Sequence, residues 1–339
     1  MPHHRRILTL LLLATLAAAS SAQDINDRVV RGSPDPAPAP INFRPAPPFL
    51  QLPPNTKLGP CSGVDLDSRG NIYLIQRQSP PILIFDPAGK FLRSFGTTQI
   101  GRDPDFDGAH GIRLDKDDFI WVTDRARHVV RKFDPSGQLL LTLGTDGSPG
   151  TGPNQFNRPA NVAFGPAGEI YVADGYGNSR IMKFDRNGKF LKTWGDKGTG
   201  PGRFDLPHAV AAGPDGRIYV CDRYNERLQI FDSEGNHQET WTGFVPAGIT
   251  FDRAGVLFVS DGISKVMQIS PRGQVIKFWG TEPAELGLTH GQRIVTPITN
   301  PGGLRFSPHL IAADPAGNLY LADVPNQMLH KLTRLPPLP

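Results

Sequence analysis

The feature that most constrains the fold is a short motif that recurs six times along the chain. Each copy is a turn tetrapeptide followed by an apolar, β-rich run that closes on Asp, or on Gln76 in the first copy. The six copies begin at Asp67, Asp115, Gly165, Gly213, Asp252 and Asp314. Their turn positions are Gly70, Asp118, Gly168, Gly216, Gly255 and Gly317. These lie roughly 40–60 residues apart, which is typical of propeller blades with several strands each. No segment holds a long 3.6-residue apolar period, so stacked helical repeats are excluded.

Within one repeat the sequence divides into four strand-forming runs separated by turn residues. In the fourth repeat the runs are HAVAAG, RIYVCD, RLQIFD and HQETWTG. Turn residues such as Pro-Asp-Gly between them fit hairpins. We therefore predict an all-β fold, a six-bladed β-propeller over residues 56–334. The sixth repeat ends at MLHKLT and lacks an outermost strand. We expect residues 49–52 (FLQL) to supply it, because ring closure removes exposed sheet edges.

The first 55 residues differ in composition from the repeats. Residues 1–22 combine a basic start, an apolar run over 7–18 and small residues up to Ala22, as in a secretory signal peptide cleaved near Ala22. The apolar run is too short for a membrane span. Residues 23–55 are Pro-rich and predict an extended segment. We expect a secreted or periplasmic protein without a membrane anchor.

Charge and cysteine content narrow the possible functions. The chain has 36 Lys and Arg against 32 Asp and Glu, and Arg5 and Arg6 would leave with the signal peptide. No cluster of basic residues indicates a nucleic-acid groove, so we expect no nucleic-acid partner. Cys61 and Cys221 belong to the first and fourth repeats, on opposite sides of a six-bladed ring, which favours two buried thiols over a disulfide. The sequence does not indicate an oligomeric state.

Three histidines occupy the same position in alternate repeats. His110, His208 and His309 each lie eight residues before the turn position of their repeat. The equivalent residues of the other repeats are small, namely Ser62, Ala160 and Ala247. Because the innermost strands line the central channel, the three imidazoles must converge on the axis, and we predict a metal site with an open position for substrate. Three neutral imidazoles suit Zn²⁺, although the ligand type is also compatible with copper or iron.

A second set of residues follows the second strand of each repeat and faces the same end of the ring, because neighbouring strands run antiparallel. This set comprises Arg77, Arg125, Gly175, Arg223, Gly262 and Val324, with Tyr176 one residue further on. Arginines beside a metal suggest an anionic, carboxylate-bearing substrate. Alternatively, they pair with the strand-end residues Asp124, Asp174 and Asp222. Arg77 is the strongest functional candidate, because its repeat has Gln76 in place of Asp.

The repeats resemble NHL repeats, in which QF-N-x-P precedes the first strand, as in residues 155–159. More specifically, nearly all of residues 58–333 resembles the peptidyl-α-hydroxyglycine α-amidating lyases. The stretches that carry this likeness are AHGIRLDKDDFIWVTDRARHVVRKFD around His110, DGYGNSRIMKFD around Tyr176, FDLPHAVAAGPDGRIYVCDR around His208 and SPHLIAADPAGNLYLAD around His309.

The resemblance implies a specific activity and a role for each site residue. It implies a six-bladed propeller with a catalytic zinc bound by His110, His208 and His309. The implied reaction cleaves the C-terminal α-hydroxyglycine of a small peptide into a peptide amide and glyoxylate. Tyr176 would take the hydroxyl proton as a base. Arg77, helped by Arg223, would hold the substrate carboxylate.

The chain departs from that family at three points. Leu310 stands where the family has an Asp that binds calcium together with two main-chain carbonyls, which would be those of Val64 and Ile112. This departure counts against a Ca²⁺ site. Gly177 replaces a Cys that follows the tyrosine. No copper monooxygenase domain is recognisable, so we expect the hydroxyglycine substrate to come from elsewhere.

Two other functions remain open from the sequence. A lactonase-type propeller hydrolase would use a metal for water attack, although such enzymes usually bind calcium through Asp, Glu and Asn. A non-catalytic NHL scaffold would bind a protein or a glycan on one face, which would make the histidine register a coincidence.

The connection before the sixth repeat is unusually long. It covers residues 281–307, includes His290 and Arg293, and directly precedes His309. Long loops are often functional, so we predict that it forms a lid over the metal face.

Overall fold

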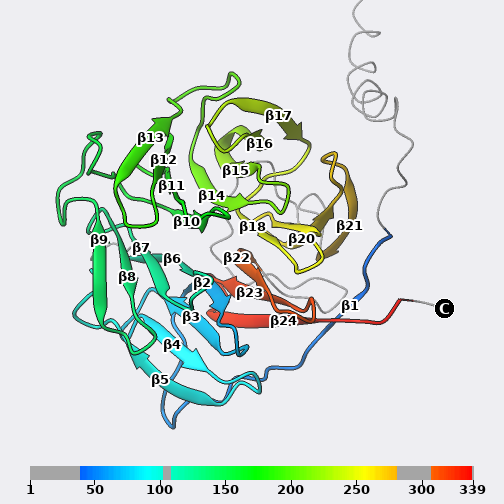
Figure 1. Ribbon diagram of the computed structural model, residues 1–339. Helices are drawn as coiled ribbons and strands as arrows, with labels where there is room; N and C mark the ends of the chain where they lie inside the picture. The colour runs from blue at the N-terminus through cyan, green and yellow to red at the C-terminus, as the bar shows by residue number, and fades with distance from the viewer. Residues whose placement is uncertain (1–38, 102–107, 281–306, 338–339) are drawn as a thin grey trace, which may run out of the picture. The chain divides into compact units, whose positions relative to one another are not determined.

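The computed structural model describes residues 39–101, 108–280 and 307–337. In these ranges the chain forms six four-stranded antiparallel sheets, which lie as blades around a central axis (Figure 1). The predicted all-β, six-bladed propeller is thereby confirmed. Among the described residues the one regular helix is a single 3₁₀ turn, η1 (Arg223–Asn225), and no helix has the length and apolar character of a membrane span.

Each blade is built from short runs rich in β-branched and aromatic residues, which favour strands. The inner-to-outer strands of blades one to three are β2 (Cys61–Leu66), β3 (Ile72–Gln76), β4 (Ile82–Phe85), β5 (Phe91–Phe95), β6 (Ala109–Leu114), β7 (Ile120–Asp124), β8 (Val129–Phe133), β9 (Leu139–Leu143), β10 (Asn161–Phe164), β11 (Ile170–Asp174), β12 (Arg180–Phe184) and β13 (Phe190–Trp194). Those of blades four to six are β14 (Pro207–Ala212), β15 (Ile218–Asp222), β16 (Arg227–Phe231), β17 (His237–Thr242), β18 (Gly248–Phe251), β19 (Leu257–Ser260), β20 (Lys265–Ile269), β21 (Val275–Gly280), β22 (Pro308–Ala313), β23 (Leu319–Asp323), β24 (Met328–Arg334) and β1 (Phe43–Pro45).

The six turn positions that define the repeat all adopt the left-handed backbone conformation, with φ between 61° and 90°. Five of them are glycines, which enter this region without a steric penalty. The sixth, Asp118, is of a type that tolerates it. The Asp118 carboxylate also accepts hydrogen bonds from the backbone N–H and the hydroxyl of Ser68 on blade one. The turn register read from the sequence therefore matches the backbone of every blade.

The ring is closed by the N-terminal segment, but not by the residues that we expected. β1 pairs antiparallel with β24 and completes blade six. Residues 49–52 instead pack their apolar side chains against the core between blades six and one, and Gln51 forms a parallel bridge with Lys90 of blade one. The prediction of residues 49–52 as the closing strand was therefore wrong. The side chains of Phe49, Leu50 and Leu52 are partly buried by this interblade packing. Pro45 is tolerated in β1 because β1 is an edge strand.

The hydrophobic core lies in layers between neighbouring blades. Cys61 packs in the layer between blades six and one, and Cys221 packs in the layer between blades four and five. Both cysteines are free and buried, as the sequence predicted. Burial raises the pKa of both thiols well above the usual range, so they remain protonated core residues.

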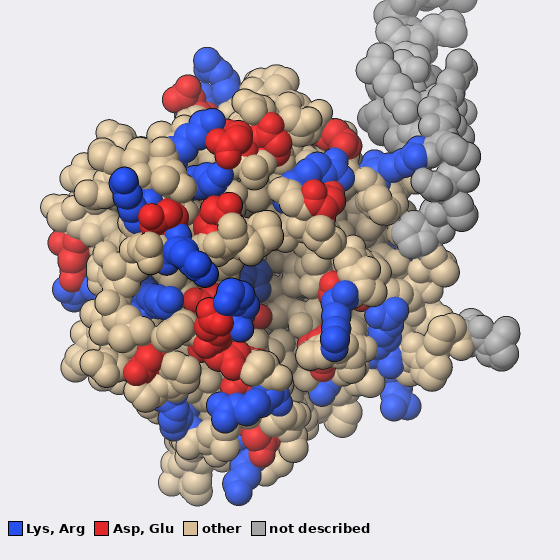
Figure 2. Space-filling view, viewed as in Figure 1, with Lys and Arg blue, Asp and Glu red and all other residues tan. Residues whose placement is uncertain are grey.

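A guanidinium group crosses the channel further along the inner strand that carries His110. Arg113 on β6 donates hydrogen bonds to the carbonyl oxygens of Ile311 at 3.0 Å and Ile249 at 2.9 Å, on blades six and five. Its charge also acts on the Asp65 carboxylate of blade one. Four of the six blades are therefore connected across the axis. On the face shown in Figure 2, basic and acidic side chains are interspersed around a central hollow.

Candidate metal centre

Local backbone geometry turns the three predicted metal ligands toward the axis. The pairing of β6 with β7 shifts register between Ala109 and Gly111, which leaves His110 as an extra residue. The same irregularity occurs at His208 in β14 and at His309 in β22. Such β-bulges re-aim side chains and are frequent beside functional sites. The repeat pattern predicted where the histidines lie but did not reveal the bulges.

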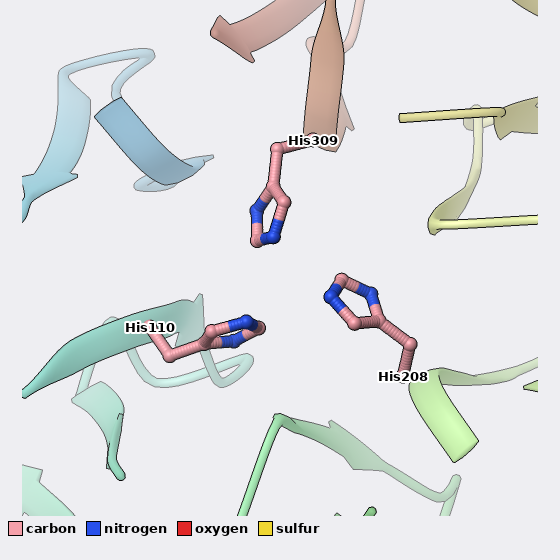
Figure 3. A group of neighbouring side chains, drawn as sticks. All are labelled: His110, His208 and His309. Atoms are coloured by element: carbon pink, nitrogen blue, oxygen red, sulfur yellow. The ribbon is translucent and has the colours of Figure 1, made fainter. Parts of the chain in front are cut away.

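The three imidazoles meet on the axis and point toward one another (Figure 3). One ring nitrogen from each histidine lies within 4.8 Å of the others, and the ring centroids are 4.8–5.0 Å apart. His110 and His208 are fully buried, and His309 is 7% exposed. The structure thus brings together all three predicted ligands in a cluster that could hold a metal ion.

Each histidine is oriented by a main-chain carbonyl of the next blade. The Nδ1 atoms of His110, His208 and His309 donate to the oxygens of Ala160 at 2.6 Å, Ala247 at 2.7 Å and Ser62 at 2.6 Å. A carbonyl oxygen can only accept, so Nδ1 carries the hydrogen and Nε2 keeps its lone pair in the neutral ring. Bonds of this kind orient metal-binding histidines. The acceptors are the small residues at the histidine register of the odd blades.

The surroundings keep these rings neutral. Burial is the main cause of the pKa of all three histidines falling well below the usual range. Nearby positive charge acts in the same direction, from Arg77 and Arg125 on His110 and from Arg223 on His208. Neutral imidazole is the form that binds metals. The donor set therefore fits a divalent metal held by three Nε2 atoms.

Tyr176 lies directly at the histidines. Its hydroxyl oxygen is 3.0 Å from Nε2 of His110 and 2.9 Å from Nε2 of His208. Because the hydroxyl has one hydrogen, it can donate to only one of these nitrogens. The lone pair of the other nitrogen then points at a lone pair of the phenolic oxygen, and the two repel each other. A cation between them would turn this repulsion into coordination, which is a second reason why these residues fit a metal.

The strand-end aspartates bind arginines of the third strands. The shortest contacts are Asp124 to Arg131 at 3.0 Å, Asp174 to Arg180 at 2.9 Å and Asp222 to Arg227 at 2.7 Å. In blade one, the Gln76 side chain accepts a hydrogen bond from the backbone N–H of Gly59 at 2.7 Å. Among the described residues, the ion pairs of these aspartates are therefore with the third-strand arginines and not with Arg125 or Arg223.

The rim arginines lie near the histidines instead. An Arg223 guanidinium nitrogen is 3.3 Å from Nε2 of His208. After burial, the positive charge of Arg77 is a further cause of the lowered pKa of both His110 and His309. Arg125, one of the rim arginines that suggested an anionic substrate but had no role implied by the family resemblance, lies over the Tyr176 ring with its guanidinium carbon 3.4 Å from the ring centroid.

The available sequence signal for Arg125 was its shared register with Arg77 and Arg223. His290 and Arg293 of the predicted lid lie outside the described residues.

Fold and site together define a six-bladed propeller with NHL repeats and a three-histidine centre. The NHL repeat model matches residues 106–133, 156–184 and 204–231. A segment of 47 residues is 47% identical to the peptidyl-glycine alpha-amidating monooxygenase of Mus musculus, covering 14% of this chain and 5% of that protein. A segment of 45 residues is 44% identical to peptidyl-alpha-hydroxyglycine alpha-amidating lyase 2 of Drosophila melanogaster, covering 13% of this chain and 11% of that protein.

These matches confirm the resemblance to NHL repeats and to amidating lyases, although they span only a small part of each relative. Among solved structures, a streptogramin B lyase superposes with a TM-score of 0.59 at 16% identity, covering 87% of this chain and 98% of the other. A gluconolactonase from Xanthomonas campestris superposes with a TM-score of 0.60 at 15% identity, covering 89% and 99%. At such identities these structures show the shared propeller fold alone.

Proposed function

We propose that this protein is a secreted, zinc-dependent carbon–nitrogen lyase that cleaves peptidyl-α-hydroxyglycine into a peptide amide and glyoxylate. The observation that carries the proposal is the convergence of three neutral Nε2 atoms with a tyrosine hydroxyl and basic side chains at one centre. The partial identity to amidating lyases supports the reaction class. Secretion would follow signal peptide cleavage near Ala22.

The three histidines would hold the metal through their Nε2 atoms. When bound, Zn²⁺ supplies Lewis-acid polarisation of a substrate oxygen. The chain contributes preorganisation, because each Nδ1–H bond to a neighbouring carbonyl keeps its ring directed at the axis. No ring rotation is needed before a ligand enters.

Tyr176 is the residue best placed to move a proton. In its deprotonated form, the phenolic oxygen would take the proton of the α-hydroxyl, and the hydroxyl oxygen would become the aldehyde oxygen of glyoxylate as the carbon–nitrogen bond breaks. The proton taken up by Tyr176 would then pass to the departing nitrogen, which becomes the primary amide, and the tyrosine would return to its deprotonated form. Every atom of the substrate appears in the two products, so no water or oxidant is consumed.

Arg77 and Arg223 would bind the carboxylate that becomes part of glyoxylate. Arg223 lies 3.3 Å from His208, and the charge of Arg77 reaches His110 and His309. A guanidinium binds a carboxylate through two parallel hydrogen bonds, which fixes the orientation of the attached carbon. Because this carbon also bears the hydroxyl and the scissile nitrogen, the two arginines would align the reacting bonds with Tyr176.

The test is release of glyoxylate from α-hydroxyhippurate by purified, zinc-loaded protein, with metal content measured in parallel. Tyr176→Phe should keep its metal and lose turnover by about 10²- to 10⁴-fold, the usual contribution of a general base. Tyr224→Phe, at an exposed tyrosine that follows Arg223, is the matched control and should leave turnover unchanged. Wild-type protein with a full metal load and no glyoxylate release would refute the proposal, and lactone hydrolysis by that protein would favour a hydrolase instead.

A further inference from the structure

We propose that Arg125 is a positioning residue that holds the Tyr176 ring against the histidine centre. The inference rests on the proposed function, because it assigns to Arg125 a part in the same reaction. It also goes beyond the sequence resemblance, which implied roles for Arg77 and Arg223 only.

The guanidinium of Arg125 lies over the face of the Tyr176 ring. Arg125 directly follows β7 on blade two, and Tyr176 comes shortly after β11 on blade three. The guanidinium carbon lies 3.4 Å from the centroid of the phenol ring, and Arg125 is 7% exposed. A cation over the face of an aromatic ring is attracted by the ring quadrupole, more strongly when it is shielded from water. Arg125 therefore covers one face of the ring.

The main chain on either side of Tyr176 is already fixed. A Cβ at Gly175 would overlap the carbonyl of Pro207, and one at Gly177 would overlap the side chain of Asn157. The backbone N–H of Gly177 also donates to the carbonyl of Asn157 at 2.8 Å. With the backbone held, the hydroxyl of Tyr176 can be displaced only by rotation about the Cα–Cβ bond, because rotation about the Cβ–Cγ bond leaves the hydroxyl in place.

Arg125 limits that rotation together with two histidines. The rings of His110 and His208 meet the Tyr176 ring edge-on, with centroids 5.1 and 5.6 Å away. These contacts and the guanidinium hold the ring so that its hydroxyl reaches both Nε2 atoms. The ring could not swing toward the face that Arg125 covers unless Arg125 moved.

Arg125 is anchored so that it can act in this way. Its backbone N–H donates to the carbonyl of Gly108 at 2.8 Å. The adjacent carboxylate of Asp124 binds Arg131 at 3.0 Å and the backbone N–H of Gly101 at 2.7 Å, so it is committed to other groups. The guanidinium is planar and matches the ring face, which a lysine ammonium cannot reproduce.

Two variants separate stacking from charge. Arg125→Lys keeps the charge and loses the planar group, whereas Arg125→Met keeps the approximate length and loses both. Hydroxyl-radical footprinting with peptide mapping measures ring exposure at Tyr176, and Tyr224, which is 52% exposed, serves as the internal reference. Thermal melting of both variants checks that the fold is retained. Footprinting needs no turnover, so it tests the stack even if the wild-type protein releases no glyoxylate and the proposed function fails.

We expect more oxidation of Tyr176 relative to Tyr224 in both variants. In zinc-loaded protein, kcat for glyoxylate release should fall by about 10- to 100-fold, the cost of misplacing a reacting group by about 1 Å, while KM stays near the wild-type value. Arg77→Met should show the opposite pattern, with a raised KM. Unchanged oxidation of Tyr176 in both variants, full turnover in Arg125→Lys, or a rise confined to KM would overturn the proposal.

Discussion

Replacing Gly262 with alanine should displace Arg223 from the histidine centre. Gly262 has a φ of 67°, and a Cβ there would lie 2.9 Å from a terminal nitrogen of Arg223 and 2.8 Å from the Cβ of Ala247. Ala247 is also the residue whose carbonyl orients His208. The added methyl group must therefore move either the guanidinium or the segment that supports His208.

The size of the effect follows from comparison with Gly216→Ala. Gly216 has a φ of 77°, and a Cβ there would meet no atom within 4 Å. Both variants carry the backbone cost of a left-handed alanine, about 1–2 kcal/mol. Only Gly262→Ala adds overpacking, which costs about 1–3 kcal/mol. The free energy of unfolding should therefore be lower in Gly262→Ala than in Gly216→Ala by about 1–3 kcal/mol.

Denaturant unfolding measures the stability difference, and KM for α-hydroxyhippurate reports the position of Arg223. A lost charge-assisted hydrogen bond is worth about 1.5–3 kcal/mol, which corresponds to a rise in KM of about 10- to 100-fold for Gly262→Ala. Gly216→Ala should leave KM unchanged. If the two variants had equal unfolding free energies and equal KM values, Gly262 would not position Arg223 and the reasoning would be wrong.

Three further outcomes follow from the described contacts. His208→Ala should lose bound metal in elemental analysis, whereas His237→Ala on the same blade, whose side chain contacts Thr240, should keep it; a full metal equivalent in His208→Ala would contradict the three-histidine site. Arg113→Met should lower the free energy of unfolding by about 3 kcal/mol in a urea titration, because two charge-assisted bonds across the channel are lost; a loss below about 1 kcal/mol would argue against the cross-channel connection. The metal-free protein should become less stable as pH falls below about 6.5. In that range the histidines are protonated in the unfolded state but stay neutral in the folded state, because folding lowers their pKa values. Above that pH these groups contribute no slope. Below it the slope is at most about 1.4 kcal/mol per pH unit for each histidine, so His208→Ala should show a shallower dependence, and a flat wild-type curve would contradict the expectation.

The ring and the histidine cluster were predictable because equivalent residues of a repeat occupy equivalent positions in the blades. Equal spacing from the turn places residues at equal heights in different blades, so His110, His208 and His309 had to converge once the blades closed. The closing strand was not predictable in this way. Residues 43–45 and 49–52 both lie in a Pro-rich segment outside the repeat, and apolar residues there suit pairing or interblade packing equally well. Only the tertiary contacts, such as those of Phe49 with Tyr320, decide between them.

The contacts of the rim arginines could not be predicted from the sequence for a related reason. Asp124 stands next to Arg125 in sequence, so local pairing was plausible. In the fold the carboxylate turns toward the third strand and binds Arg131, and the guanidinium of Arg125 lies over the Tyr176 ring. The stack joins loops from two blades, and register alone does not specify how two loops meet.

The centre also depends on the closure of the ring. Even blades supply the imidazoles and odd blades supply the carbonyls that orient them, so each ligand requires a correctly docked neighbour. For His309 that neighbour is Ser62 of blade one, and the bond between them spans the seam that β1 helps to close. A metal bound by all three histidines would therefore bind the closed ring in preference to an open one. By mass action it would stabilise that seam in proportion to the logarithm of its concentration. Metal binding and ring closure would then be one coupled equilibrium, and the Pro-rich segment would contribute to the site without touching it.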